Sequence, residues 1–335
     1  MITDARVLQA EFVPKDLVHR DNELTTLSAA LKPLTNGEPG ETTLLHGPPG
    51  VGKTCTTQYI LKQLHENVID LNTQYVNCWK DHTQFQTLYR ILEGIDQTLD
   101  IHRQSTPTDK LRDRLHNYDG PPYVVVLDEA DQLETTDVLY NIYRTPNVEM
   151  VLIANQEEDL FSRLDNRLKS RLQTITRIHY KPYRSGEIVS ILEDRVHWGL
   201  EPDAVIPDQL ERIAVASKGD ARVAIGVLRK AARLASQNNE NGISDEYIDD
   251  AVPEAKTEIK QKNVEKLTED QRILYDVLTE EGETSAGRLY EVYQNRIDEP
   301  KTKRMMRYYL QKMQHYNLVV ANGENRGRTY NTHSS

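Results

Sequence analysis

The segment Gly47–Thr54, with the sequence GPPGVGKT, carries the most specific chemical pattern in the chain. It satisfies G-x-x-x-x-G-K-[ST], follows an apolar stretch and opens a segment with helical periodicity, which is the context this motif requires. Its glycines let backbone N–H groups surround phosphate oxygens, and the positive end of the following helix adds to the attraction. We therefore expect a nucleoside triphosphate site with Lys53 on the β- and γ-phosphates and the Thr54 hydroxyl on Mg²⁺. The expected phosphate-loop contacts are Gly47, Pro48, Pro49, Gly50, Val51, Gly52, Lys53, Thr54 and Cys55.

A second pattern, VVVLDEAD, ends an apolar run in acidic residues. Ligands of open α/β sheets bind at the carboxyl ends of the strands, so this run would deliver its acids to the phosphate site. We expect Asp128 to hold Mg²⁺ together with Thr54, and Glu129 to orient and deprotonate the attacking water. Asp131 is expected to cap a helix rather than to bind metal.

A third pattern, VLIAN, ends a further apolar run in Asn155. Its amide would lie beside the two acids and hold either the lytic water or the γ-phosphate. An Asx turn is the alternative, and the spacing alone does not decide between them.

These residues need a parallel sheet to bring them together. Short apolar runs alternate with amphipathic helical segments over residues 42–180, which is typical of βαβ units. The expected strands are Thr42–His46, Thr73–Cys78, Tyr123–Asp128, Val148–Asn155 and Thr174–Tyr180.

Beyond this region the pattern becomes helical. Residues 185–252 predict four helices, and residues 253–266 predict a linker or an exposed helix. Three further helices (Glu269–Glu281, Ser285–Arg296, Lys301–Tyr316) and a hairpin follow, which is typical of a winged helix. We expect three domains: an α/β nucleotide-binding domain (1–180), a helical lid domain (181–255) and a winged-helix domain (256–335).

The composition narrows the function classes. The chain of 335 residues carries a formal net charge of −11, which argues against bulk polyanion binding. The longest apolar runs are strand-sized, so no membrane association is expected. The N-terminus lacks a secretion signal, and Cys55 and Cys78 have no metal-ligand spacing. A cytoplasmic protein is expected.

The three chemical patterns in this order, followed by helices, resemble the AAA+ ATPases over roughly residues 12–252. The resemblance implies an α/β fold with an AAA+ parallel sheet, a helical lid and ATP or ADP with Mg²⁺ as cofactors. The segment LDNRLKSRL (164–172) looks like the stretch that carries the arginine finger, so Arg167 would act in trans, with Arg171 as a competitor. The segment KGDARVAIGVLRKA (218–231) looks like the second sensor motif, in which Arg222 reaches the γ-phosphate. Arginine suits both roles because its planar fork matches phosphate oxygens.

Within AAA+ proteins the chain resembles the archaeal replication initiators of the origin recognition complex and cell-division-control family. The lead-in FVPKDLVHRDNEL (12–24), the C-terminal winged helix and the segment VNCWKDHTQFQTLYRIL (76–92) carry this resemblance. The family has a DNA-contacting insertion at the last segment, but the connections here are compact. The resemblance implies that Val13, Pro14, Arg20 and Tyr183 border the nucleotide.

The helix expected at Lys301–Tyr316 divides into two faces at about 100° per residue. One face is a core stripe, formed by Met306, Tyr309, Leu310, Met313 and Tyr316. The other face offers cations for phosphates and donors for base edges, and the wing adds two arginines. The expected DNA contacts are Lys301, Lys303, Arg304, Arg307, Tyr308, Gln311, Arg326 and Arg328.

These features favour an ATP-dependent replication initiator that is nucleoid-associated. We expect it to bind origin duplex DNA, to help recruit the replicative helicase and to act with itself or a paralogue on DNA. Hydrolysis would be Mg²⁺-dependent, slow and regulatory. The alternative is a switch ATPase of the clamp-loader or transposition-helper type, whose C-terminal module binds a protein.

Overall fold

A five-stranded parallel sheet forms the centre of the N-terminal half in the computed structural model, which describes all residues except 69, 324–326 and 333–335. The strand order is β2-β3-β4-β1-β5. Its strands are β1 (Thr43–His46), β2 (Asn72–Asn77), β3 (Tyr123–Asp128), β4 (Val148–Ala154) and β5 (Thr176–His179). All five expected strands are confirmed, with bounds shifted by at most two residues.

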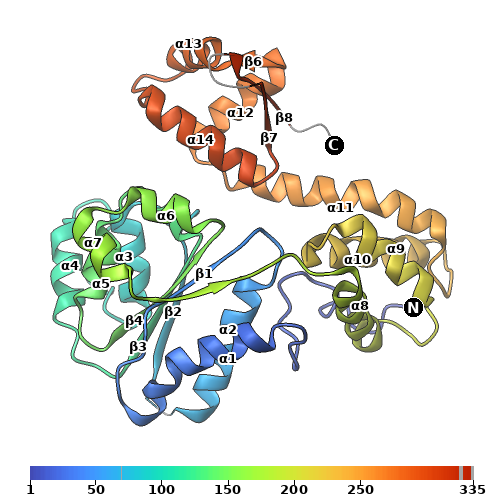
Figure 1. The fold of residues 1–335 in the computed structure, drawn as a ribbon, viewed down its shortest axis with the longest axis horizontal. Helices are drawn as coiled ribbons and strands as arrows, with labels where there is room; N and C mark the ends of the chain where they lie inside the picture. The colour runs from blue at the N-terminus through green and yellow to red at the C-terminus, as the bar shows by residue number, and fades with distance from the viewer. Residues whose placement is uncertain (69, 324–326, 333–335) are drawn as a thin grey trace.

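Helices cover both faces of this sheet (Figure 1). Alternate residues of a strand point to opposite faces, so Val124 and Val126 pack on one side and Val125 and Leu127 on the other. The first side is covered by α1 (Asp21–Leu31) and α2 (Lys53–Asn67). The second side is covered by α3 (Gln84–Glu93), α4 (Thr108–His116) and α5 (Asp137–Tyr143).

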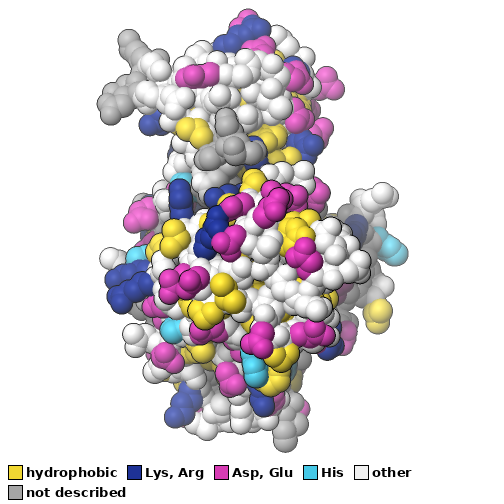
Figure 2. Space-filling view, turned by 90° about the vertical axis from the view of Figure 1, so that its right-hand side faces the viewer, with side chains coloured by type: hydrophobic (Ala, Val, Ile, Leu, Met, Phe, Trp, Pro, Cys, Tyr) yellow, Lys and Arg dark blue, Asp and Glu magenta, His cyan; other side chains and the backbone are white. Residues whose placement is uncertain are grey.

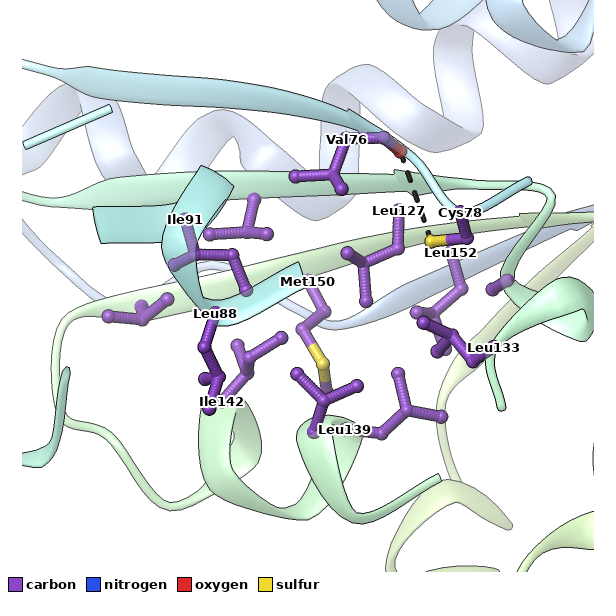
Figure 3. Packing of buried hydrophobic residues seen from close by; sticks show 14 of the residues in the cluster. Val76, Cys78, Leu88, Ile91, Leu127, Leu133, Leu139, Ile142, Met150 and Leu152 are labelled. Carbon is purple, nitrogen blue, oxygen red and sulfur yellow. Dashed lines mark hydrogen bonds between the residues drawn. The ribbon is translucent and has the colours of Figure 1, made fainter. Parts of the chain in front are cut away.

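Figure 3 shows, from close by, the hydrophobic core between the sheet and the helices on its second side. Leu88 and Ile91 of α3 and Ile142 of α5 enclose Met150 of β4, and all four side chains are fully buried. Burial of each such side chain contributes about 1.5–3 kcal/mol. The strand ends that carry the polar residues are therefore held on a rigid, densely packed base.

The lid consists of α8 (Ser185–Gly199), α9 (Pro207–Ser217), α10 (Ala221–Gln237) and the first half of α11 (Asp245–Glu265). The N-terminal residues pack on it: Leu8 is part of the lid core, and Arg195 donates a hydrogen bond of 3.0 Å to the Val7 carbonyl. The sequence analysis assigned these first residues to the α/β domain, whereas in the structure they pack on the lid.

Helix α11 continues through Pro253 and up to Glu265. For residues 253–266 the sequence predicted either a linker or an exposed helix, and the structure has a helix there. The expected boundary at residue 255 therefore lies inside one continuous helix. This helix joins the lid to the C-terminal domain (Figure 1).

The C-terminal domain contains α12 (Glu269–Glu281), α13 (Ala286–Arg296) and α14 (Lys303–His315). Strands β6 (Thr284–Ser285), β8 (Thr329–Thr332) and β7 (Val319–Asn322) form its antiparallel sheet. Helix α14 begins two residues later than expected, because the Thr302 side chain caps it by accepting from the Met305 N–H. Three helices and a hairpin are present, as expected.

The surface shown in Figure 2 is mixed in charge. Acidic side chains are spread over this face, and Lys and Arg side chains lie between them rather than in one broad patch. Among the described residues, no helix combines the length and apolarity that would let it cross a bilayer.

Candidate functional site

The phosphate loop lies between β1 and α2. Gly50 has a φ of +74°, and a Cβ at this position would lie 1.8 Å from the Asp220 carboxylate of the lid. The Ala221 N–H also donates to the Gly50 carbonyl at 3.0 Å. Only glycine satisfies both the backbone conformation and this close approach of the lid.

Lys53 is the first residue of α2 and is buried. Its Nζ donates to the carbonyls of Gly47 and Pro48, at 2.5 and 2.8 Å, and lies 3.4 Å from Asn155 Oδ1. Burial lowers the pKa of Lys53 to about 8. The ammonium thus lies inside the loop, where its donors can turn from carbonyls to phosphate oxygens.

Thr54 and Asp128 meet across the sheet edge as expected for a shared metal. The Thr54 hydroxyl donates to Asp128 Oδ2 at 2.7 Å, and the Tyr75 hydroxyl donates to the same oxygen at 2.6 Å. A hydroxyl and a carboxylate are hard oxygen donors of the kind Mg²⁺ prefers, so this pair fits the ion. Tyr75, on the neighbouring strand β2, thus helps to fix the orientation of the Asp128 carboxylate.

Glu129 follows Asp128 in a left-handed backbone conformation, with φ 57°. Its Oε2 is buried and has no hydrogen-bond partner among the described residues, while Lys266 Nζ lies 4.0 Å from Oε1. Burial raises the pKa of Glu129 to about 7, and Lys266 opposes that rise. An unpaired, buried carboxylate oxygen at this edge is suited to accept a proton from a positioned water.

Asn155 follows β4 and lies between two domains. Its Oδ1 faces Lys53, and its Nδ2 donates to the Tyr316 hydroxyl of the C-terminal domain at 2.7 Å. The amide therefore lies at the phosphate loop, as the sequence predicts, but it also has a partner 161 residues away.

One cavity joins these residues, and its walls come from all three domains. Most of the predicted site residues line it: Pro14, Pro49, Gly50, Val51, Gly52, Lys53, Thr54, Cys55, Asp128, Glu129, Asn155, Tyr183 and Arg222. Four other residues that were expected to border the nucleotide are not part of its lining: Val13, Arg20, Gly47 and Pro48.

Arg20 supports the cavity from outside. It is 5% exposed, and it donates hydrogen bonds to the carbonyls of Val51 and Lys181 at 3.0 and 2.8 Å. Its guanidinium lies 3.8 Å from the centre of the Tyr183 ring. Arg20 therefore holds the loop and the aromatic wall in place.

Sequence reasoning missed Tyr75, Asn77, Lys266 and Tyr316, which also line the cavity. A signal existed for the first two: Asn77 pairs in register with Asp128, and Tyr75 lies two residues earlier on the same face of β2. Nothing local marked Lys266 or Tyr316, because only tertiary packing brings them here.

Arg222 is the second residue of the lid helix α10 and lines the cavity. Asp220 caps this helix by accepting from the N–H groups of Arg222 and Val223, and its other oxygen lies 3.3 Å from the Arg222 guanidinium. The cap thus holds the arginine at the cavity wall.

Arg167 lies on α7 (Asn166–Leu172) and does not line the cavity. Its side chain is 75% exposed and lies 3.6 Å from Asp165. Both arginines lie over the Tyr140 ring, Arg167 at 5.7 Å and Arg171 at 5.2 Å, but only Arg167 is exposed. The exposed Arg167 is the freer of the two to reach another molecule.

Asp131 is not a helix cap, so that prediction is wrong. It lies inside the short 3₁₀ turn η2 (Ala130–Gln132), is buried, and accepts from Gln132 Nε2 at 2.7 Å. The buried cation Lys312 of α14 acts on this carboxylate and opposes the rise in its pKa. An electrostatic interaction with a residue 181 positions away thus replaces the local role that the sequence suggested.

The cationic residues at the start of α14 are exposed and unpaired. Lys301, Lys303, Arg304 and Arg307 form no ion pair within the part of the chain that the structure describes. In contrast, Arg288 and Arg296 of α13 pair with acids of α12, Glu281 and Glu280. Arg328 is also exposed, whereas Arg326 lies outside the described residues.

Tyr308 and Gln311 are placed differently from this cationic end. The Tyr308 hydroxyl donates to the Asp131 carbonyl, and Gln311 Nε2 donates to Asp159 Oδ1 at 3.1 Å. In this arrangement both side chains contact the α/β domain; Tyr308 is partly buried there, whereas Gln311 is still exposed. Their contact with DNA stays a prediction, and it requires a different domain position.

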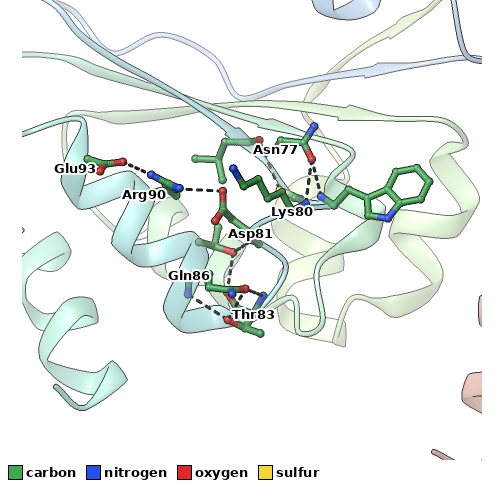
Figure 4. Close-up of polar contacts among 11 residues, drawn as sticks. Asn77, Lys80, Asp81, Thr83, Gln86, Arg90 and Glu93 are labelled. Atoms are coloured by element: carbon green, nitrogen blue, oxygen red, sulfur yellow. Dashed lines mark hydrogen bonds and ion pairs between the residues drawn. The ribbon is translucent and has the colours of Figure 1, made fainter. Parts of the chain in front are cut away.

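The segment after β2 forms a compact, internally bonded turn (Figure 4). Asn77 accepts from the N–H groups of Trp79 and Lys80, and Thr83 and Gln86 form a capping box at the start of α3. Arg90 is held by Asp81 and Glu93, at 3.2 and 2.7 Å. Its charge is therefore compensated within the segment.

Comparisons with known proteins agree with this geometry. The AAA ATPase domain family matches residues 16–238. ORC1-type DNA replication protein 1 of Halobacterium salinarum is 54% identical over 92% of this chain and 100% of its own length. ORC1-type DNA replication protein 9 of the same organism is 47% identical over 98% of this chain and 93% of its own.

A solved structure of the ORC1 protein of Aeropyrum pernix in complex with DNA is also similar. It aligns with a TM-score of 0.78 and 26% identity, and the alignment covers 100% of this chain and 94% of that one. The AAA+ fold expected from the sequence is confirmed.

Proposed function

Because the chain belongs to the ORC1-type family of DNA replication proteins and contains an AAA ATPase domain, we propose that it is an ATP-controlled replication initiator. It binds origin duplex DNA, helps to recruit the replicative helicase and acts with itself or a paralogue. It works in the cytoplasm, on the nucleoid.

The observation that carries the DNA-binding part is the unpaired cationic start of α14. Four exposed cations lie within seven residues of a domain whose other helices pair their arginines with acids. When unpaired Lys and Arg side chains contact DNA phosphates, they displace the counterions bound to the DNA. The release of these counterions contributes to the binding affinity. The similar ORC1 protein of Aeropyrum pernix was solved in complex with DNA, which supports DNA binding in general.

The ATP site supports a switch role. Lys53 binds the phosphates, Thr54 and Asp128 hold Mg²⁺, and the carboxylate of Glu129 accepts a proton from water. The bound Mg²⁺ supplies charge neutralisation at the phosphates. Arg222 acts from the lid, while the exposed Arg167 serves the site of a neighbouring molecule. Hydrolysis is slow because one subunit lacks that arginine in its own cavity.

Genome-wide footprinting tests the proposal. The purified protein, with Mg²⁺ and ATP, is incubated with genomic DNA of its source organism, and the protected fragments are sequenced. We expect one or a few sites, AT-rich and flanked by repeats. Uniform protection, or capture of a protein without any duplex preference, would contradict the proposal and favour the switch ATPase alternative.

A further inference from the structure

The C-terminal domain docks on the α/β domain through one stripe of α14. We call this the docking face: Tyr308, Gln311, Lys312, His315 and Tyr316. Their spacing of three or four residues places them on one side of the helix. The first four residues of the docking face interact with Asp131 or Asp159, and the last residue, Tyr316, reaches the ATP cavity.

Several contacts fix this docked position. Arg163 donates to the carbonyl of Asp131 and to the Tyr308 hydroxyl, at 2.6 and 2.9 Å. His315 Nδ1 lies 3.1 Å from Asp159 Oδ2. Trp79 of the α/β domain inserts into the core of the C-terminal domain, with its ring centre 4.1 Å from that of Tyr316.

The contact between Tyr316 and Asn155 joins the C-terminal domain to an amide at the phosphate loop, and Lys53 determines how that amide is oriented. Asn155 Oδ1 must face Lys53 Nζ, since an ammonium is only a donor. One N–H of Asn155 then donates to the Tyr316 hydroxyl, at 2.7 Å. The second N–H remains available for the γ-phosphate or the lytic water.

We propose that Tyr316 is a positioning residue for ATP turnover: the docked C-terminal domain fixes the Asn155 amide, so that ATP binding and docking stabilise each other. The coupling must be reciprocal, because a ligand that favours one arrangement is itself bound more tightly by it. This inference rests on the ATP site of the proposed function.

A consequence concerns DNA. The docked state leaves the cationic start of α14 and Gln311 exposed, but the Tyr308 hydroxyl is bound to the Asp131 carbonyl and Gln311 is hydrogen-bonded to Asp159. A duplex that engages the whole helix must therefore displace the docking face, and the proposal expects this displacement to release Asn155 and to slow ATP turnover.

Trp79 provides a direct reporter of docking. The chain has two tryptophans; Trp79 is 3% exposed and Trp198 is 61% exposed. In a Trp198→Phe protein, iodide quenching of the remaining tryptophan measures docking. We expect saturating Mg²⁺ and a slowly hydrolysed ATP analogue to lower the quenching constant by about half, and Tyr316→Phe to abolish most of this change.

Tyr309→Phe in the same background is the matched control, because Tyr309 lies on the same helix and packs within the C-terminal core. It should retain the nucleotide-dependent change. An unchanged nucleotide response in Tyr316→Phe, or no response in the Trp198→Phe parent, would overturn the inference. Binding of the analogue is titrated separately: loss of binding in the parent contradicts the proposed function, whereas binding without a quenching response contradicts only this inference.

A kinetic measurement separates positioning from folding. Tyr316→Phe keeps the ring against Trp79 and removes one hydrogen bond near the reacting phosphate. We expect kcat to fall roughly fivefold with KM within about twofold, because loss of a single hydrogen bond costs about 1 kcal/mol. Equal loss in Tyr309→Phe, or an unchanged kcat in Tyr316→Phe, would also overturn it.

Discussion

At the residue scale, Lys53 is the centre of the ATP site. Its ammonium is enclosed by two carbonyls and one amide oxygen, so its position is set before any phosphate is bound. When a nucleotide binds, these donors exchange the loop carbonyls for phosphate oxygens, while the ammonium already lies inside the loop that holds the phosphates.

Lys53→Ala should abolish detectable nucleotide binding, because it removes the cation that meets the β- and γ-phosphates. Equilibrium titration with a fluorescent ATP analogue measures this. Lys62→Ala is the matched control, since Lys62 lies on the same helix but is exposed. Binding by the Lys53 variant within about threefold of the control would contradict the assignment.

Glu129→Gln should retain ATP binding and lower turnover by at least about 100-fold, since an amide cannot accept the proton from water. ATP binding and single-turnover hydrolysis are measured on the same preparation. Retained hydrolysis would refute the role of Glu129 as the base.

The sequence was sufficient for residues whose chemistry is local. The phosphate loop, Asp128, Glu129 and Asn155 lie at the strand ends and loop where their motifs predict them. Tyr316 and Lys266 could not be found this way, because their role depends on how the C-terminal domain docks and not on neighbours in the sequence.

At the element scale, α14 shows what periodicity can and cannot predict. The expected core stripe is confirmed, since Met306, Leu310, Met313 and Tyr316 are buried in the C-terminal core and Tyr309 packs against it. The opposite face was expected to be open, yet from Tyr308 onward it contacts the α/β domain. Helical periodicity reports that a face is polar, but not which partner it meets.

Strand β4 contains a half-buried acid, Glu149, that makes stability depend on pH. Burial raises the pKa of Glu149 from 4.5 to about 7, while a backbone hydrogen bond from Gly40 opposes the rise. Between these values the unfolded chain releases the proton and the folded chain keeps it. The free energy of unfolding therefore falls as pH rises from about 4.5 to 7, and stays lower above that range.

Glu149→Gln should remove this fall in the free energy of unfolding, because the amide does not titrate. We expect the variant to be more stable than the parent by about 1–2 kcal/mol at pH 8, after allowance for partial solvent screening, and by much less at pH 5. Thermal unfolding followed by circular dichroism at both pH values measures the difference. Glu66→Gln, at an exposed position of α2, is the control and should show no such pH dependence. A Glu149 variant of equal stability at pH 8 would contradict the account.

At the scale of the whole molecule, the ATP cavity lies where three domains meet. The α/β domain supplies the phosphate loop and acids, the lid supplies Arg222, and the C-terminal domain supplies Tyr316. The sequence predicted three domains and the type of each. It could not predict that the third contributes to the ATP site, or that one helix crosses the expected boundary.

Positive and negative charges are distributed unevenly over the whole molecule. The chain is acidic overall, yet residues 298–335 contain seven Lys and Arg against three Asp and Glu. Because acidic side chains elsewhere would repel a duplex, we expect attraction to be confined to the exposed start of α14 and to the arginines predicted for the wing.

The most direct test of the account is the salt dependence of duplex binding by the Arg304→Ala/Arg307→Ala protein. The control is Arg288→Ala/Arg296→Ala, which removes two cations of the same domain that are paired with acids. We predict weaker binding of origin duplex by the first variant and a slope of log K against log salt that is shallower by about 2, with little change in the control. Unchanged affinity and slope, or equal losses in both proteins, would contradict the assignment of α14 as the DNA-contacting helix.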